Sequence, residues 1–304
     1  MPYQFRSFQS GDFTEIRNFL VQFYQNYQLG NWTLDRLNFT YSVSRILNNT
    51  SEEDWQRKAG IWYRGEHICA VILSEGEQRG EAVMLLNAEP DETLLQDLFE
   101  FCDNHMSHLN NETGEQEIFL SIPNRPNAID AWLARFGYQP AGWEEVDSYL
   151  SLHHQEAVKL AEGYSLLSGG QITPRAKAKA HAQTWGYYES ADYNEARCTQ
   201  AWAAMTNMPD YIPDLDLCAV TEDGEIAAFV TLWLDTKNEL AILEPVGTVV
   251  CHQRKGLSKA LIQEGCHRAL KLGAKRVKVG SDIPAYLAMG FQPAQRYPIF
   301  RKNI

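Results

Sequence analysis

A short run of residues between a predicted strand and a predicted helix has the composition of an anion-binding turn. The strand ends near Val250, the helix covers Leu257–Leu272, and between them lies Gln253-Arg254-Lys255-Gly256. A glycine-containing turn at a helix start leaves backbone N–H groups without partners at the positive end of the helix dipole, where an anion binds readily. The two basic residues of this run, together with Lys259, add positive charge. The run therefore predicts a phosphate-binding turn.

The distribution of charge agrees with a localised anionic ligand. The chain of 304 residues has a formal net charge of −12, which argues against a general nucleic-acid binder because neutralising phosphates needs a basic surface. From Cys251 to Ile304, however, there are eleven Lys and Arg residues and two acidic residues. One multiply phosphorylated ligand would require such a basic segment. The alternative is a chance surplus of Lys and Arg on solvated helix faces.

The turn resembles the acyl-CoA-binding signature of the GNAT superfamily of N-acetyltransferases, [QR]-x-x-G-x-[GA]. Gln253 and Gly256 stand at the first two defined positions, and Ser258 replaces the small residue at the third. The serine could crowd a pyrophosphate or donate one more hydrogen bond to it. The similarity extends from Tyr164 to Arg301, in the family's order of elements, and neither dinucleotide-binding nor P-loop glycine patterns are present.

This resemblance implies acetyl-CoA as co-substrate. Its pantetheine arm would pair with the main chain at the end of the strand before the turn, and its pyrophosphate would sit on the N–H groups from Arg254 to Lys259. The residues that the resemblance implies for cofactor binding are Val246, Gly247, Thr248, Gln253, Arg254, Lys255, Gly256, Leu257, Ser258 and Lys259.

Two side chains are candidates for acid and base catalysis, since transfer to an amine needs a neutral nucleophile and a proton for the departing thiolate. Tyr286 stands where GNAT enzymes often carry a tyrosine that acts as the general acid, and the alternative is a packing aromatic. Glu244 shares a strand face with Val246 and Thr248 by the period of two, so its carboxylate could deprotonate the amine directly or through water. The alternative for Glu244 is a solvated or salt-bridged side chain beside an irregular strand position at Pro245.

Further residues could line the acceptor pocket. Carboxylates suit a cationic amine and aromatic rings suit its flat or aliphatic body. These candidates are Tyr211, Asp216, Trp233, Asp235 and Trp202, each of which could instead belong to the core or the surface. We expect no metal site, and we expect the six cysteines, scattered without C-x-x-C spacing, to be buried free thiols.

Two similar phrases half a chain apart indicate a repeated unit. Residues 134–141 (ARFGYQPA) and 287–294 (LAMGFQPA) both place a glycine where a short helix ends and an aromatic residue where a strand begins. With the length, this predicts two domains, at 1–155 and 156–304. The first copy predicts helices at 12–29, 33–48, 92–106 and 127–136 and strands at 59–63, 67–73, 82–86 and 117–122, with a last strand after Gly137. The second predicts helices at 174–185, 195–206, 257–272 and 283–289 and strands at 164–167, 215–220, 226–233, 240–250, 276–279 and 291–300.

This succession predicts an α/β fold, of the mixed α+β kind, with two tandem GNAT-like domains. Each would have a mixed, largely antiparallel central sheet flanked by helices. At the place of the phosphate turn, the first copy has Asn87-Ala88-Glu89-Pro90-Asp91-Glu92, without glycine or basic residue. We therefore expect 1–155 to be a degenerate GNAT-like domain without a phosphate loop, and 156–304 to carry the acetyl-CoA site.

The functional hypothesis is an N-acetyltransferase that moves an acetyl group from acetyl-CoA to a primary amine of a small molecule by direct attack. Two alternatives stay open: a non-catalytic acyl-CoA-binding or regulatory protein, and a protein or peptide N-acetyltransferase. The N-terminal sequence lacks a signal-peptide pattern, and no apolar run approaches the roughly 20 residues that cross a bilayer. We expect a cytoplasmic protein without membrane or nucleic-acid partners, monomeric or homodimeric.

Overall fold

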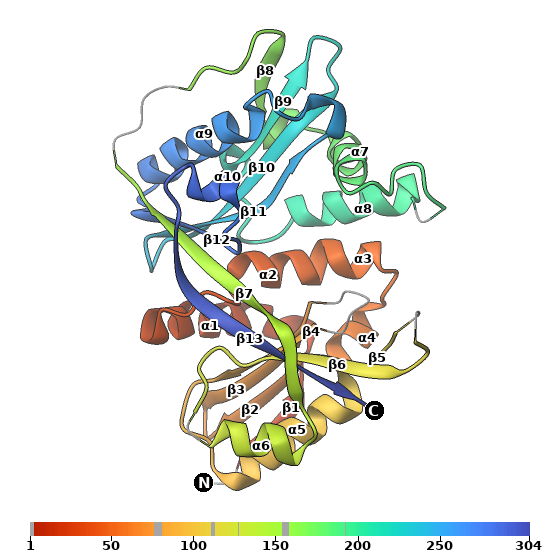
Figure 1. Cartoon of the computed structure of the whole chain (residues 1–304), viewed down its shortest axis with the longest axis vertical. Helices are drawn as coiled ribbons and strands as arrows, with labels where there is room; N and C mark the ends of the chain where they lie inside the picture. Colours follow the sequence, from red (N-terminus) through yellow and green to blue (C-terminus); the bar gives the residue numbers. More distant parts are fainter. Residues whose placement is uncertain (1–2, 76–80, 111–112, 127, 154–157, 192) are drawn as a thin grey trace. The chain divides into compact units, whose positions relative to one another are not determined.

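The protein folds into two compact units, each built from more than one stretch of the chain (Figure 1). The computed structural model describes residues 3–75, 81–110, 113–126, 128–153, 158–191 and 193–304. The first unit comprises Met1–Trp32, Asn48–Val146 and Gln295–Ile304. The second unit comprises Thr33–Leu47 and Asp147–Ala294.

The first unit contains a mixed sheet. Its strands are β1 (Tyr3–Ser7), β2 (Gly60–Arg64), β3 (His67–Ser74), β4 (Glu81–Leu86), β5 (His108–Leu109), β6 (Gln116–Ser121) and most of β13 (Gln292–Asn303). Its helices are η1 (Ser10–Asp12), α1 (Phe13–Tyr27), α4 (Glu52–Arg57), α5 (Glu92–His105) and α6 (Ile129–Arg135). The order is β1-β2-β3-β4-β6-β13, with β5 beside β6, and β4 with β6 is the parallel pair.

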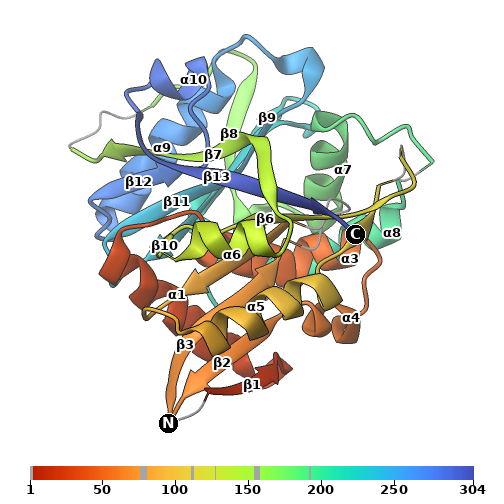
Figure 2. The ribbon, with the colours of Figure 1, turned by 60° about the horizontal axis from the view of Figure 1, so that its bottom comes forward.

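Helices α5 and α6 cover one face of this sheet, in front of β2 and β3 in Figure 2. Leu98 and Phe99 of α5 are fully buried against strand residues such as Ile72. Burying one such side chain stabilises the fold by about 1.5–3 kcal/mol. The expected helix at 127–136 begins at Ile129, and residue 127 lies outside the described residues.

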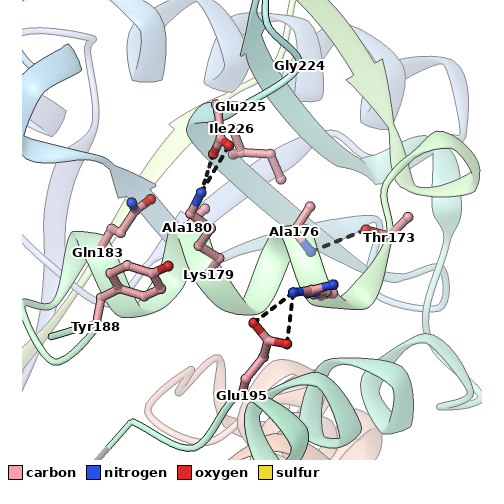
Figure 3. A pocket seen from close by; sticks show the side chains of 11 residues that line it. Thr173, Ala176, Lys179, Ala180, Gln183, Tyr188, Glu195, Gly224, Glu225 and Ile226 are labelled. Atoms are coloured by element: carbon pink, nitrogen blue, oxygen red, sulfur yellow. Dashed lines mark hydrogen bonds and ion pairs between the residues drawn. The ribbon is translucent and has the colours of Figure 1, made fainter. Parts of the chain in front are cut away.

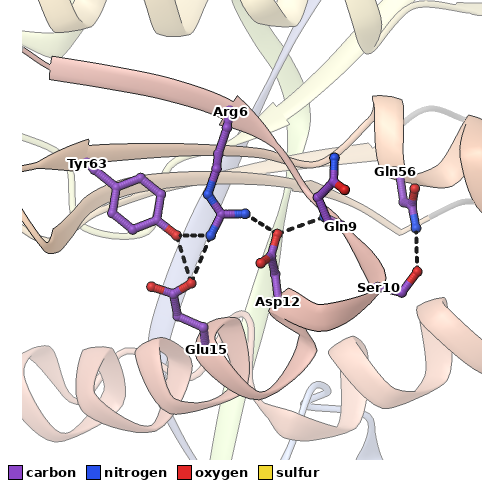
Figure 4. A network of polar contacts seen from close by, with 7 residues as sticks. All are labelled: Arg6, Gln9, Ser10, Asp12, Glu15, Gln56 and Tyr63. Atoms are coloured by element: carbon purple, nitrogen blue, oxygen red, sulfur yellow. Dashed lines mark hydrogen bonds and ion pairs between the residues drawn. The ribbon is translucent and has the colours of Figure 1, made fainter.

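A polar network ties α1 to the edge of the first unit's sheet (Figure 4). Arg6 of β1 donates from Nη2 to the Tyr63 hydroxyl at 2.6 Å and to Glu15 Oε2 at 3.0 Å, and the Tyr63 hydroxyl donates to Glu15 at 2.8 Å. Arg6 also pairs with Asp12, which accepts from the Gln9 amide. Burial and the Glu15 carboxylate raise the pKa of Tyr63 to about 12, so this hydroxyl stays a donor.

The second unit has the same kind of sheet. Its strands are the end of β7 (Gln139–Ser151), β8 (Tyr164–Ser168), β9 (Asp216–Thr221), β10 (Ile226–Asp235), β11 (Leu240–Thr248) and β12 (Arg276–Val279). Its helices are α2 (Leu34–Phe39), η2 (Thr40–Ser44), α3 (Arg45–Leu47), η3 (Gly169–Gln171), α7 (Pro174–Thr184), α8 (Glu195–Thr206), η4 (Pro213–Leu215), η5 (Val250–His252), α9 (Leu257–Lys271) and α10 (Pro284–Leu287). The order is β7-β12-β11-β10-β9-β8, and β11 with β12 is the parallel pair.

Helices cover both faces of the second sheet. Helix α9 packs on the face that carries Val230 and Leu232, whereas α7 packs on the face that carries Phe229. Gly265 lets α9 approach closely, because a Cβ there would lie 2.4 Å from Leu232. The mixed, largely antiparallel sheets flanked by helices confirm the predicted fold class.

Two segments differ from the predicted division at 1–155 and 156–304. The C-terminal segment Gln295–Ile304 belongs to the first unit, where Ile299 lies opposite Ser121 of β6. The end of β7 belongs to the second unit, where Ser151 lies opposite Arg276 of β12. The last strand of each sequence copy thus completes the sheet of the unit formed mainly by the other copy. The boundary at 155/156 lies outside the described residues.

The segment 33–47 also differs from expectation, because it belongs to the second unit and is not one regular helix. A π-helical turn, η2, separates α2 from α3. The Ser42 hydroxyl donates to the Asn38 carbonyl, which competes with the regular helical pattern of backbone bonds. Strand β1 and helix α4 have no counterpart in the prediction. Five cysteines are buried as expected, but the prediction is wrong for Cys251, which is exposed in the surface turn after β11.

Candidate functional site

The predicted phosphate turn connects β11 to α9 through an uncapped helix start. Gly256 is the N-cap residue of α9, with φ at 75°, and no side chain caps this end within the described residues. Arg254 also has a positive φ of 62°. The amides of the first helical turn have no intrahelical acceptor and lie at the positive end of the dipole. The turn can therefore accept an anion on its backbone.

Positive charge surrounds the amides of this turn. Arg254, Lys255 and Lys259 are all exposed. Among the described residues, none of the three has a carboxylate partner. Their charge is therefore available to a ligand.

The serine that departs from the family pattern is bonded to the preceding strand. The hydroxyl groups of Ser258 and Thr248 form a hydrogen bond, and Gln253 donates from Nε2 to the Thr248 carbonyl at 3.4 Å. In the protein alone the Ser258 hydroxyl is thus turned toward β11. These bonds hold the turn against the strand.

Strand β11 has one open edge beside the turn. It pairs with β12 only from Leu240 to Ile242, while its other edge pairs with β10 as far as Thr248. In the part of the chain that the structure describes, no strand pairs with the first edge beyond Ile242. Gly247 is required here because a Cβ would lie 2.3 Å from the Phe229 ring. Val246, Gly247 and Thr248 thus lie where an extended ligand could pair with main-chain groups.

The candidate base lies at an irregularity in β11. The register between β10 and β11 shifts between Val230 and Leu232, so Glu244 and Pro245 lie opposite a single residue of β10. The Trp233 indole donates from Nε1 to the Glu244 carbonyl oxygen at 2.8 Å. The bond satisfies a carbonyl at the bulge, and the Glu244 side chain is exposed.

The candidate acid, Tyr286, lies on α10 and within the electrostatic influence of Glu244. Its ring packs edge-on against Phe291, with centroids 5.6 Å apart. Burial, and then the negative charge of Glu244, raise the pKa of the Tyr286 phenol above its ordinary value. The phenol is therefore protonated at neutral pH, as a general acid must be.

Two candidate acceptor residues are bonded within the protein. Asp216 is buried and forms an ion pair with Lys177, and it accepts from the Thr231 hydroxyl and the Tyr211 hydroxyl at 2.8 Å each. The Asp216–Tyr211 pair therefore closes an internal network on β9. Sequence reasoning missed Lys177, because an alternating Ala-Lys helix gives no signal that one lysine faces the core.

Two more acceptor candidates, Trp233 and Asp235, also have partners within the protein. Trp233 is buried and makes the bond to Glu244. Asp235 accepts from the amides of Lys237 and Asn238 at 3.1 Å each, in the turn between β10 and β11. This role is that of a turn-forming aspartate.

A separate pocket of about 330 Å³ lies between α7 and the turn before β10 (Figure 3). Its cations are neutralised locally, since Arg175 pairs with Glu195 at 3.0 Å and Lys179 with Glu225 at 2.8 Å. The cations of the phosphate turn differ, because they pair with no carboxylate in the described parts of the chain.

In the first unit, side chains of the protein bind the backbone groups at the position equivalent to the phosphate turn. Asp91 caps α5 by accepting from the Leu94 amide at 3.0 Å. Asn124 bonds the end of β4, accepting from the Leu86 amide at 3.3 Å and donating to the Leu86 carbonyl. In this copy Asp91 thus occupies the helix end and Asn124 occupies the strand end.

Residues 179–291 match the model of the Acetyltransferase (GNAT) family. This segment of the chain resembles a GNAT domain. A GCN5-related N-acetyltransferase from Sphaerobacter thermophilus shares 16% identity, with a TM-score of 0.61 over 99% of this chain and 95% of that one. A tandem GNAT protein from the clavulanic acid biosynthesis pathway shares 14% identity, with a TM-score of 0.59 over 99% of this chain and 98% of that one. No curated protein sequence matches.

These similarities confirm the predicted resemblance and the tandem GNAT-like fold. A GNAT domain supports acyl transfer, and the family uses acetyl-CoA as co-substrate. Among the described helices, none combines the length and the apolar composition needed to cross a bilayer.

Proposed function

We propose that this protein transfers an acetyl group from acetyl-CoA to a primary amine of a small molecule by direct attack. The observation that carries the proposal is the uncapped start of α9 at Gly256, flanked by cations that have no carboxylate partner among the residues the structure describes. In the first unit Asp91 caps the equivalent helix, so the difference between the two copies lies in their capacity to bind an anion.

The coenzyme would lie along β11 and end on the turn. Its pantetheine amides would pair with the open edge at Val246–Thr248, and its diphosphate would accept from amides of the turn between Arg254 and Lys259. This path leads from the turn toward the bulge at Glu244. The acetyl group would then lie near the acid and base candidates.

Glu244 and Tyr286 would each handle one proton of the reaction. Glu244 takes one proton from the substrate ammonium, directly or through water, which leaves a neutral amine to attack the thioester carbonyl. Tyr286 gives its phenolic proton to the departing thiolate when the carbon–sulfur bond breaks. The attacking nitrogen loses its second proton to water as the tetrahedral intermediate collapses to the amide. Glu244 then releases its proton to water, and Tyr286 regains one from water. The raised pKa of Tyr286 suits this role, because a protonated phenol must persist between turnovers.

The acceptor proposal follows from which carboxylate is exposed to solvent, since Asp216 and Asp235 are both buried. Asp216 and Asp235 are bonded within the protein, whereas the Glu244 side chain is exposed at the bulge. This arrangement favours a compact amine with one ammonium group over an extended basic peptide. The proposed acceptor site therefore includes Glu244 and omits Tyr211, Asp216 and Asp235.

The test combines binding with turnover. We expect acetyl-CoA to raise the melting temperature of the protein, since a ligand that binds only the folded state stabilises it. A panel of small amines and basic peptides, assayed by release of free thiol, then identifies the acceptor class. Binding without Tyr286-dependent turnover would instead support a regulatory protein, and turnover with peptides alone would support a peptide acetyltransferase. Absence of a thermal shift at millimolar acetyl-CoA would overturn the proposal.

A further inference from the structure

We propose that Tyr164, His252 and Lys255 form a second anion subsite beside the phosphate turn, which takes the phosphomonoester on the ribose of coenzyme A. The proposal rests on the proposed acetyl-CoA site. It adds that the site distinguishes coenzyme A from a form that lacks the ribose phosphate. It assigns Tyr164 the role of a positioning residue, which acts on the ligand through Lys255 and His252.

The three side chains form a continuous chain of contacts. Lys255 donates from Nζ to the Tyr164 hydroxyl at 2.7 Å, and its ammonium lies 5.3 Å from the centre of the Tyr164 ring. The Tyr164 hydroxyl lies 2.9 Å from His252 Nδ1, and the two rings meet edge to face at 5.7 Å. Strand β8, helix η5 and the turn each contribute one member.

Because the lysine ammonium can only donate, the Tyr164 oxygen accepts from Lys255. We assign the Tyr164 proton to the bond with His252 Nδ1, as part of the proposal, because this leaves the histidine with its proton on Nε2. Two groups therefore remain as donors for a ligand: the remaining N–H bonds of Lys255 and the Nε2–H of His252.

Tyr164 is an uncharged partner for Lys255. The cations of the α7 pocket are paired with glutamates, whereas Lys255 has no carboxylate partner among the described residues. The phenol limits the motion of the lysine without cancelling its charge. Such a cation interacts more strongly with an incoming anion than one already neutralised.

The position of Lys255 indicates which phosphate it meets. The backbone amides at the start of α9 already suffice for a diphosphate. The Lys255 ammonium donates instead to the hydroxyl of Tyr164, the first residue of β8. Coenzyme A carries one further phosphate, a monoester with up to two negative charges near neutral pH, which matches a cation and a neutral donor placed side by side.

The test compares acetyl-CoA with acetyl-dephospho-CoA, which lacks the ribose phosphate. We expect the wild-type protein to bind acetyl-CoA about tenfold more tightly, the ratio that one charge-assisted contact produces. Tyr164→Phe keeps the ring and removes the hydroxyl, and it should abolish most of this preference by weakening acetyl-CoA alone. Lys255→Gln should do the same. Tyr188→Phe, in the separate α7 pocket, should keep the wild-type ratio.

The outcomes separate this inference from the proposed function. Wild-type protein that binds both ligands equally overturns the second subsite and leaves the acetyl-CoA site standing. A Tyr164→Phe variant that weakens both ligands by the same factor also overturns it, since a purely structural role would act on both. Protein that binds neither ligand overturns both proposals. An unliganded melting temperature close to wild type shows that each variant is folded.

Discussion

The indole of Trp233 donates a hydrogen bond to the main-chain carbonyl of Glu244, at 2.8 Å, from the neighbouring strand. The bond lies at the bulge where β10 and β11 lose their regular register, so a buried side chain replaces a missing ladder bond. Trp233 was expected to touch the acceptor. Its contact instead fixes the backbone from which the proposed base projects.

Replacing Trp233 should therefore impair catalysis more than coenzyme binding. In Trp233→Phe the partly buried Glu244 carbonyl loses its donor, which costs about 1 kcal/mol of stability. The backbone that positions the Glu244 carboxylate is then held less firmly. We expect kcat to fall about ten- to a hundredfold, with little change in the KM for acetyl-CoA. Steady-state kinetics measure both quantities.

Trp202 offers a matched control for this substitution. It is equally buried in the second unit, but its Nε1 has no hydrogen-bond partner among the described residues. Trp202→Phe removes the same volume without breaking a hydrogen bond. If both variants lose the same fraction of kcat, the bond to Glu244 has no special role.

Tyr286→Phe tests the proposed acid directly. Removing the phenolic proton should lower kcat about 10²- to 10⁴-fold, the usual contribution of a general acid, without lowering the affinity for acetyl-CoA. Tyr211→Phe is the contrasting variant, because the Tyr211 hydroxyl binds Asp216 inside the protein and its loss should lower the melting temperature instead. Unchanged kcat in Tyr286→Phe would remove the acid from the mechanism.

The pH dependence of kcat should report the interaction between Tyr286 and Glu244. Burial and the Glu244 charge raise the phenol pKa, so the phenol stays protonated and the alkaline loss of activity should lie above about pH 10. In Glu244→Gln the negative charge is gone, so the pKa of the Tyr286 phenol should fall. The alkaline limb of the pH profile of kcat should then move to lower pH. A limb that stays in place would show that the two groups do not interact.

The sequence predicted local structure well where the signal is local. Helix α8 and strand β12 have the predicted bounds, because capping residues and apolar periodicity specify both ends. The start of α9 was likewise predictable, since the helix begins at Leu257 directly after Gly256. The residues of one short segment determine each of these features.

Features set by distant residues were not predictable. The repeat of ARFGYQPA and LAMGFQPA predicts a strand after each glycine, but the partner of that strand depends on the whole fold, so the exchange of β7 and β13 remained hidden. Asp216 resembled a ligand for a cationic substrate because its partner, Lys177, lies 39 residues away. A buried carboxylate cannot be distinguished from a functional one until its partner is known.

Asp216→Asn should therefore act on stability. Breaking a buried ion pair leaves Lys177 without its counter-charge, at a cost of about 3–5 kcal/mol. Lys177→Met combined with Asp216→Leu should recover part of this loss, since both charges are then removed. Chemical denaturation measures the free energy of unfolding. A stable Asp216→Asn protein with a raised KM for the amine would return Asp216 to the acceptor site.

Removing residues 295–304 should destabilise the first unit. This segment pairs with β6 from Ser121 to Glu117 and buries Ile299 and Phe300, so its loss exposes a strand edge and apolar surface. For the same reason, 156–304 expressed alone should lack a stable fold, because the end of β7 that pairs with β12 is missing. Circular dichroism and thermal melting check both. A cooperative melt of 156–304 near the wild-type temperature would contradict the exchange of strands.

Gly256→Glu should abolish the thermal shift produced by acetyl-CoA. The substitution places a carboxylate at the start of α9, where it competes with the diphosphate for the same amides and repels it. A side chain at this positive φ also strains the backbone by about 1–2 kcal/mol, so the apoprotein should melt slightly lower. Gly224→Glu is the matched control, since Gly224 has a φ of 81° and equally open surroundings in a turn away from the proposed coenzyme path. Equal thermal shifts in the two variants would show that the start of α9 does not bind the coenzyme.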